Sequence, residues 1–156
     1  MKVGLYLSCY PELDNRQAPL GLGYLAAFAK KKLPHADFII ENDLDRLIEA
    51  KPDLVGFSIL TKMATLANRQ ARQVKDALGC PILCGGPHIT ALPATLADPF
   101  DVAVLGEGEQ TFSELLRLFS SEGKFSGLSL SKIQGIAYRD AGTVVRTPER
   151  PFFENL

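Results

Sequence analysis

The stretch CPILCGGPHIT, residues 80–90, joins an apolar strand to two glycines, a proline and a histidine. At the end of a strand, Gly85 and Gly86 allow unusual backbone angles and let another group approach the chain closely. The pair is compatible with a plain tight turn as well as with a ligand. His88 could brace the loop, shuttle a proton or bind a metal. The role of this junction therefore depends on what surrounds it in the sequence.

Strands of the same apolar kind recur along the chain and alternate with helical patterns. The expected strands are residues 2–7, 37–40, 53–58, 81–84 and 101–105. Apolar residues at helical spacing lie between them. Continuously apolar strands favour a parallel sheet that is covered on both faces. The sequence therefore predicts an α/β fold with a doubly wound, flavodoxin-like or Rossmann-like parallel sheet of five strands in the order 2-1-3-4-5.

Local signals mark where the helices begin and end. Asn42 or Asp43 is expected to cap the second helix, and Gly79 is expected to end the third. Thr111 and Glu114 have the spacing of a capping box at the start of the fifth helix.

The last part of the chain has a different pattern. Residues 133–147 offer two short strands around Gly142, which predicts a C-terminal hairpin. Residues 148–156 contain two prolines and two adjacent phenylalanines, which indicates an extended arm that docks on something else. We therefore divide the chain into an α/β domain, residues 1–127, and a hairpin with a linker arm, residues 128–156.

Composition and charge exclude several classes of function. A chain of 156 residues supports one domain with a proper core. Its 17 basic and 18 acidic residues leave a net charge of −1, so we expect no nucleic-acid partner and no membrane partner. No apolar run in the sequence is long enough for a membrane span. Three cysteines, an odd number, indicate reduced thiols in the cytoplasm, with Cys80 and Cys84 buried as small apolar residues.

The loops that follow the strands bring the candidate binding residues together. In an open parallel sheet, ligands bind beyond the carboxyl ends of the strands. The loops after the first, third, fourth and fifth expected strands all lie at this edge. The candidate cofactor-binding residues in these loops are Ser8, Tyr10, Ser58, Leu60, Thr61, Gly85, Gly86, Pro87, His88, Gly106, Glu107, Gly108 and Glu109.

The acidic pair in GEGE, residues 106–109, restricts the chemistry of the ligand. Glu107 and Glu109 stand at the start of a helix, where Glu109 could simply interact with the helix dipole. Two carboxylates at this point would repel a phosphate, which is bound by bare backbone N–H groups. The edge therefore suits a ligand rich in amide or hydroxyl donors. Ser58 and Thr61 remain open to a second interpretation as helix caps.

A rival signal is GLGYLA, residues 21–26, which resembles the G-x-G-x-x-A fingerprint of dinucleotide-binding domains. The fingerprint has its first glycine in the turn directly after the first strand. Here thirteen residues separate Leu7 from Gly21. We therefore interpret Gly21 and Gly23 as positions where the first helix packs closely on the sheet. A nucleotide- or dinucleotide-binding domain stays open as an alternative.

Neither a nucleophile–base pair nor a zinc-type cluster of cysteine and histidine is evident in the sequence. We therefore expect no catalytic residue and no iron–sulfur or other metal site of its own in this domain. The pattern indicates a binding domain.

Four motifs together resemble the cobalamin-binding N-terminal domain of radical SAM (S-adenosylmethionine) proteins. They are LGLGYLAA (residues 20–27), FSILT (57–61), GGPHIT (85–90) and DVAVLGEGEQTFSELL (101–116). The resemblance covers nearly the whole chain. It implies that this domain binds the corrinoid cofactor cobalamin at the carboxyl edge of the sheet and is not catalytic alone.

The resemblance also implies a longer parent protein. In such proteins an arm similar to residues 149–156 leads into a barrel-like domain with a C-x-x-x-C-x-x-C motif. That following domain binds a [4Fe-4S] cluster and S-adenosylmethionine. The parent is therefore expected to be a cobalamin-dependent radical SAM enzyme, a methyltransferase or an enzyme of related radical chemistry.

One element of the wider cobalamin-binding family is missing. Ser58-Ile59-Leu60 matches its S-x-L motif and Gly85-Gly86 its glycine pair, but no D-x-H-x-x-G motif follows the first strand. In the family, that histidine is the lower ligand of cobalt. His88 lies on a different loop and is only a weak candidate for cobalt. A fold-only domain that has lost its cofactor and docks a partner is the remaining alternative.

Overall fold

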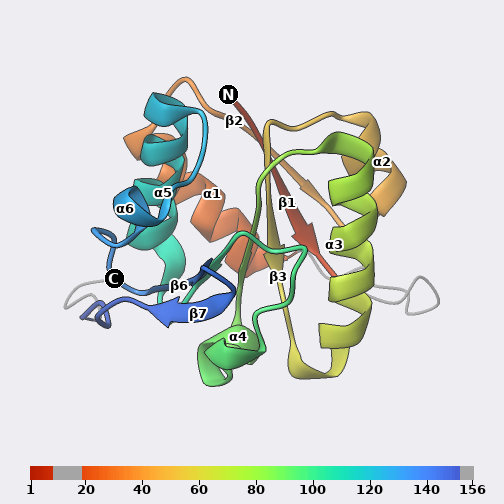
Figure 1. Cartoon of the computed structure of the whole chain (residues 1–156). Helices are drawn as coiled ribbons and strands as arrows, with labels where there is room; N and C mark the ends of the chain where they lie inside the picture. Colours follow the sequence, from red (N-terminus) through yellow and green to blue (C-terminus); the bar gives the residue numbers. More distant parts are fainter. Residues whose placement is uncertain (9–18, 152–156) are drawn as a thin grey trace.

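The computed structural model describes residues 1–8 and 19–151 (Figure 1). The strands are β1 (Lys2–Leu7), β2 (Asp37–Glu41), β3 (Leu54–Ser58), β4 (Ile82–Gly85), β5 (Val102–Val104), β6 (Ile136–Asp140) and β7 (Thr143–Arg146). The helices are α1 (Leu20–Lys32), α2 (Leu44–Glu49), α3 (Ala64–Leu78), α4 (Pro87–Ala91), α5 (Gly108–Glu122) and α6 (Gly127–Leu130). Two short 3₁₀ turns, η1 (Thr61–Met63) and η2 (Pro93–Thr95), complete the described elements.

The strands form one sheet in the order β2-β1-β3-β4-β5-β6-β7. The first five strands are parallel and have the predicted order 2-1-3-4-5. The predicted hairpin is confirmed as β6 and β7, and β6 pairs antiparallel with β5 from Val102↔Tyr138 to Val104↔Ile136. The hairpin thus extends the parallel sheet from five strands to seven. It covers the edge that β5 would otherwise expose.

Helices cover both faces of the sheet, as a doubly wound fold requires (Figure 1). On one face, α1 and α5 pack over a core that includes Leu5, Leu83 and Phe112. On the other face, α2 and α3 pack over a second core that includes Phe57 and Ile82. Both cores are buried, which explains why the strands are apolar without alternation.

The predicted ends of α2 and α3 are confirmed. The carboxylate of Asp43 accepts hydrogen bonds from the backbone N–H groups of Asp45 and Arg46 at the start of α2. Gly79 ends α3 in the left-handed conformation, with φ of 63°.

The capping box predicted at Thr111 and Glu114 is wrong. Helix α5 begins earlier, at Gly108, so Thr111 lies inside its first turns. The Thr111 hydroxyl donates to the carbonyl oxygen of Gln134 at 3.2 Å and accepts from Arg150 Nε at 2.8 Å. The Arg150 guanidinium also bonds to the Glu114 carboxylate. These contacts attach Arg150 to α5, while Phe152 and Phe153 lie outside the described residues.

The interpretation of Gly21 and Gly23 as close-packing positions is also wrong. Both glycines lie inside α1, and a Cβ atom at either position would meet no atom within 4 Å. Within the described ranges, no helix is long and apolar enough to cross a membrane.

Alanine substitutions at two glycines, Gly4 in β1 and Gly23 in α1, test this packing. A Cβ atom at Gly4 would lie 2.7 Å from Leu47 Cδ1 and 3.1 Å from Pro52 Cγ. We expect Gly4→Ala to lower the free energy of unfolding by about 1–3 kcal/mol, because the buried core must shift. Gly23→Ala should raise it by about 0.5–1 kcal/mol, because the helix gains an alanine in open space. Urea denaturation measures both, and equal effects would contradict the packing described.

Candidate functional site

The floor of a pocket is formed by residues that share one face of the sheet. Leu5 pairs with Gly56, and Gly56 pairs with Leu83, so a glycine lies between two leucines in a row across three strands. Nearer the carboxyl edge, Ser58 pairs with Gly85 on the same face. Side chains alternate along a strand, and here three small residues coincide on the face below α1 and α5. The sheet is therefore hollowed at this point.

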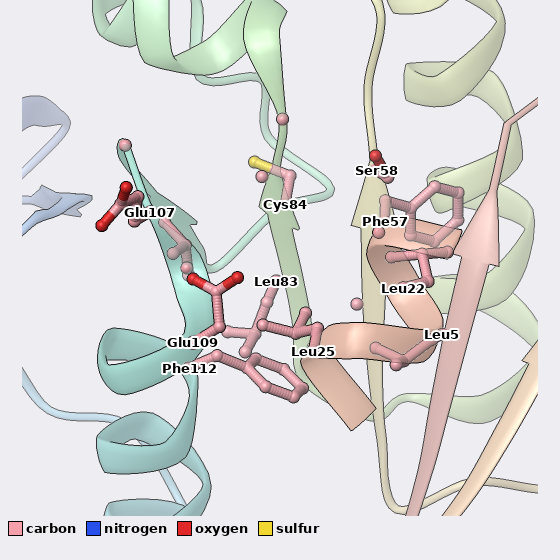
Figure 2. Close-up of a pocket in the computed structure, with 17 residues that line it drawn as sticks. Leu5, Leu22, Leu25, Phe57, Ser58, Leu83, Cys84, Glu107, Glu109 and Phe112 are labelled. Carbon is pink, nitrogen blue, oxygen red and sulfur yellow. The ribbon is translucent and has the colours of Figure 1, made fainter. Parts of the chain in front are cut away.

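The hollow opens into a pocket with a volume of about 270 Å³ (Figure 2). Helix α1 contributes Gly21, Leu22 and Leu25 to its walls, and α5 contributes Glu109 and Phe112. The remaining lining residues are Leu5, Gly56, Phe57, Ser58, Leu83, Cys84, Gly85, Gly86, Val104, Gly106, Glu107 and Gly108. The pocket is thus a largely apolar slot with a few oxygen-bearing side chains, a combination typical of small-molecule sites.

Glu109 is the notable polar group of the pocket. It lies in the first turn of α5, and Figure 2 shows its carboxylate directed into the pocket. Its Oε2 atom is buried and has no hydrogen-bond partner among the described residues. A buried acceptor without a donor is costly. The site is therefore chemically incomplete and matches a ligand that brings an N–H or O–H group.

The two glycines of the Gly85-Gly86 pair have different roles. A Cβ atom at Gly85 would make only ordinary contacts, the nearest 3.6 Å from the Val104 carbonyl oxygen. Gly86 has φ of 98° and ψ of −179°, a region that is essentially restricted to glycine. A Cβ atom at Gly86 would lie 3.0 Å from both the backbone nitrogen and oxygen of Ile59. Gly86 is thus required by the backbone, whereas Gly85 leaves space in the pocket.

Hydrogen bonds hold the loops of the pocket together. The Ile59 N–H donates to the Gly85 carbonyl oxygen at 2.9 Å, and the His88 N–H donates to the Ile59 carbonyl oxygen at 3.2 Å. The Gly106 N–H donates to the Thr90 hydroxyl at 3.1 Å. The loops after β3, β4 and β5 therefore form one connected edge.

The structure brings more than half of the candidate residues to the pocket. These are Ser58, Gly85, Gly86, Gly106, Glu107, Gly108 and Glu109. Leu60, Thr61 at the start of η1 and Pro87 at the start of α4 are exposed and do not line the pocket. Tyr10 lies outside the described residues.

Ser8 and His88 make internal contacts instead. The buried Ser8 hydroxyl donates to Gln70 Oε1 at 2.6 Å, and Gln70 Nε2 donates to the Tyr6 hydroxyl at 2.9 Å. His88 is partly buried in α4, with Nε2 3.4 Å from the Thr95 hydroxyl. Among the described residues, no group of three or more histidine, cysteine, aspartate or glutamate side chains could hold a metal ion. His88 therefore has the geometry of a loop brace.

Several pocket residues were not among the sequence candidates. They are Leu5, Gly21, Leu22, Leu25, Gly56, Phe57, Leu83, Cys84, Val104 and Phe112. Gly56 carried a usable signal, because a glycine inside an apolar strand indicates a close approach by another group. Cys84 is buried, and burial raises the pKa of its thiol well above the ordinary value. The Cys84 side chain belongs to the core on the opposite face of the sheet, so its protonated thiol is no nucleophile of the pocket.

These observations define a class of protein: a doubly wound α/β domain with a small-molecule pocket at the carboxyl edge of its parallel strands. The sequence model of the B12 binding domain family matches residues 12–116, about two thirds of the chain. The chain belongs to the B12-binding domain family.

Longer proteins contain a similar domain. The chain is 32% identical over 151 residues to a protein of Pyrococcus horikoshii described as an uncharacterized methyltransferase. The alignment covers 88% of this chain and 31% of that protein. The chain therefore spans less than a third of the length of this relative.

Longer proteins of known structure also contain a domain of this fold. The cobalamin-dependent S-adenosylmethionine radical enzyme OxsB, with aqua-cobalamin bound, superposes with a TM-score of 0.73 at 21% identity and covers 97% of this chain and 22% of its own. The radical S-adenosylmethionine methyltransferase TsrM from Kitasatospora setae, with cobalamin and a [4Fe-4S] cluster bound, superposes with a TM-score of 0.74 at 18% identity. That alignment covers 94% of this chain and 30% of TsrM.

The contrast between Gly85 and Gly86 generates a direct test. We expect Gly86→Ala to lower the free energy of unfolding by about 1–3 kcal/mol, because alanine is strained at this φ and its Cβ would press on Ile59. Gly85→Ala is the matched control and should cost less than about 1 kcal/mol. Chemical denaturation provides the measurement. A larger loss for Gly85→Ala than for Gly86→Ala would contradict the assigned roles.

Proposed function

We propose that this chain binds cobalamin at the pocket between α1, α5 and the carboxyl ends of β3 to β5, as the corrinoid-binding module of a larger enzyme. The observation that carries the proposal is the apolar, glycine-floored pocket with an unpartnered carboxylate oxygen. Membership in the B12-binding domain family supports it.

The size of the pocket decides which part of the cofactor would enter it. Ligand pockets usually measure about 300–1,000 Å³, so a pocket of about 270 Å³ is small. It suits a flat bicyclic ring and excludes a corrin macrocycle. Cobalamin contains both, because its nucleotide tail ends in dimethylbenzimidazole. We therefore assign the pocket to this lower base, packed among Leu25, Leu83 and Phe112.

The corrin ring would then lie outside, on the edge formed by the loops. Leu60 follows β3, Leu92 follows α4, and both expose apolar surface, at 40% and 48%. Ser58 and Glu107 line the outer part of the pocket and offer oxygen atoms for hydroxyl and amide groups of the ligand. These residues bind and orient. When bound, cobalamin supplies a cobalt that can carry a methyl group.

A lower base held in the pocket is separated from the cobalt. The domain should therefore bind cobalamin in the base-off form, without a protein histidine beneath the ring. His88 supports this arrangement, because its backbone and side chain engage Ile59 and Thr95, and it does not line the pocket.

The dinucleotide alternative lacks its required geometry. Gly21 and Gly23 lie within α1, where the Gly23 N–H already donates to the Pro19 carbonyl oxygen at 3.0 Å. At the start of α5, Glu109 occupies the first turn and the Gly106 N–H is bonded to Thr90. A phosphate at this helix start would meet the Glu109 carboxylate.

We further propose that the parent protein is a radical SAM enzyme, with a following domain that binds a [4Fe-4S] cluster and S-adenosylmethionine. The relatives named above support this, since the chain spans only 22–31% of each of them. Arg150 supports it as well, because its contacts with Thr111 and Glu114 fix the arm next to the pocket helix. The free, buried thiols of Cys80 and Cys84 fit a cytoplasmic protein.

A substitution that fills the pocket tests the proposed site. A Cβ atom at Gly108 would lie 3.5 Å from Leu25 Cδ1 and from Val104 Cγ1, so a larger side chain there is directed at two pocket walls. We expect Gly108→Leu to weaken hydroxocobalamin binding at least about tenfold, as measured by spectral titration. Gly23→Leu is the control, because it adds the same side chain to open space away from the pocket. Equal affinity of the two variants, both folded by circular dichroism, would contradict the site.

The assignment of the pocket to the lower base of cobalamin has its own test. Cobinamide keeps the corrin ring and lacks the nucleotide and lower base. We expect it to bind at least about tenfold more weakly than cobalamin, because cobinamide has no lower base to bury in the apolar pocket. Bound methylcobalamin should show the yellow base-off spectrum. Equal affinity for cobinamide, or a red base-on spectrum of the complex, would contradict the assignment.

A further inference from the structure

Glu109 has an unpartnered oxygen that the binding of cobalamin alone does not account for. The inference from this oxygen rests on the proposed function. Glu109 Oε2 is buried in the pocket that we assign to the lower base. Its surroundings there include the apolar side chains of Leu25, Leu83 and Phe112. A ligand that leaves this oxygen without a donor would bind with a penalty.

Two neighbouring donors of the protein are engaged elsewhere. The Ser113 hydroxyl, one turn along α5, donates to the backbone carbonyl oxygen of Glu109 at 2.7 Å. The Gly106 N–H donates to Thr90. The side chains of Leu25 in α1 and Leu83 in the sheet, which line the pocket with Glu109, carry no hydrogen-bond donor. The donor is therefore expected to come from the ligand.

The chemistry of lower bases then becomes decisive. Dimethylbenzimidazole offers no N–H or O–H group when it is linked in cobalamin, because one ring nitrogen carries the ribose and the other is a bare acceptor. Its edge consists of methyl groups and C–H groups. An adenine base of similar size carries an exocyclic amino group, which is a hydrogen-bond donor. Adenine would satisfy Glu109, while dimethylbenzimidazole would not.

We propose that Glu109 is a specificity-determining residue that selects corrinoids whose lower base carries an N–H donor, adenine in particular. The preference arises because a site built around a buried acceptor discriminates against an analogue that lacks the matching donor. Cobalamin still binds through its corrin ring and the apolar walls, but less tightly than the adenine-based corrinoid.

The test is a spectral titration of the purified chain with hydroxocobalamin and with the corrinoid that differs from it by an adenine lower base. We expect the wild-type chain to bind the adenine corrinoid about tenfold more tightly. In Glu109→Leu the preference should disappear, and cobalamin itself should bind at least as tightly as before, because the unpartnered oxygen is gone. Glu107→Leu is the matched control, which removes the other carboxylate of the pocket; it should change the affinities for the two corrinoids alike and keep the preference between them.

The outcomes separate this inference from the proposed function. Equal affinity of the wild-type chain for the two corrinoids would overturn the role of Glu109 and leave cobalamin binding intact. It would mean that a hydroxyl or amide common to all corrinoids satisfies the oxygen. A preference that survives in Glu109→Leu would overturn the role as well. Absence of binding by either corrinoid to the wild-type chain would instead overturn the proposed function on which the inference rests.

Discussion

The absence of a side chain at Gly56 is the constraint on which the site depends. Gly56 pairs with Leu5 on one side and Leu83 on the other, in the middle of a parallel sheet. A Cβ atom there would lie 3.0 Å from Leu5 Cδ2 and 3.7 Å from Phe112 Cε2. An alanine at position 56 would therefore press on Leu5, and a larger side chain would also displace Phe112. The space at the carboxyl edge lies above Ser58 and Gly85 on the same face, and the close packing of Leu5 and Phe112 over Gly56 forms its inner end.

The start of α5 sets the polarity of that hollow. A helix N-terminus beside a glycine-rich loop is ordinarily suited to an anion. Here Glu109 occupies the first turn, and its carboxylate has an oxygen that the described residues leave without a partner. The Glu109 carboxylate therefore favours a hydrogen-bond donor over an anion at the start of α5, which separates this position from the phosphate-binding helix starts found on the same type of sheet. Fold alone does not make this distinction, whereas the carboxylate does.

Much of this organisation was predictable from sequence, and the parts that were not have physical reasons. Apolar strands, helical spacing and Gly142 in the last turn predicted the sheet order and the hairpin, because these patterns are local. Gly85 and the GEGE segment were found because they follow strands. Leu25 and Phe112 escaped, because helical spacing marks them as core and only the tertiary fold shows a pocket beside them. Ser8 was predicted to bind the cofactor because it stands at the end of a strand. That position does not reveal its hydrogen bond to Gln70, 62 residues away.

The central claim is that an aromatic lower base enters the space between α1, α5 and the hollowed face of the sheet. Methyl NMR spectra of the chain, recorded with and without hydroxocobalamin, test it most directly. The account predicts large ring-current shifts for the methyl groups of Leu25, Leu83 and Val104, which line the pocket. Methyl groups of Leu47 and Val74, in the core on the opposite face, should stay unchanged. Binding that shifts only the exposed leucines Leu60 and Leu92 would contradict the account.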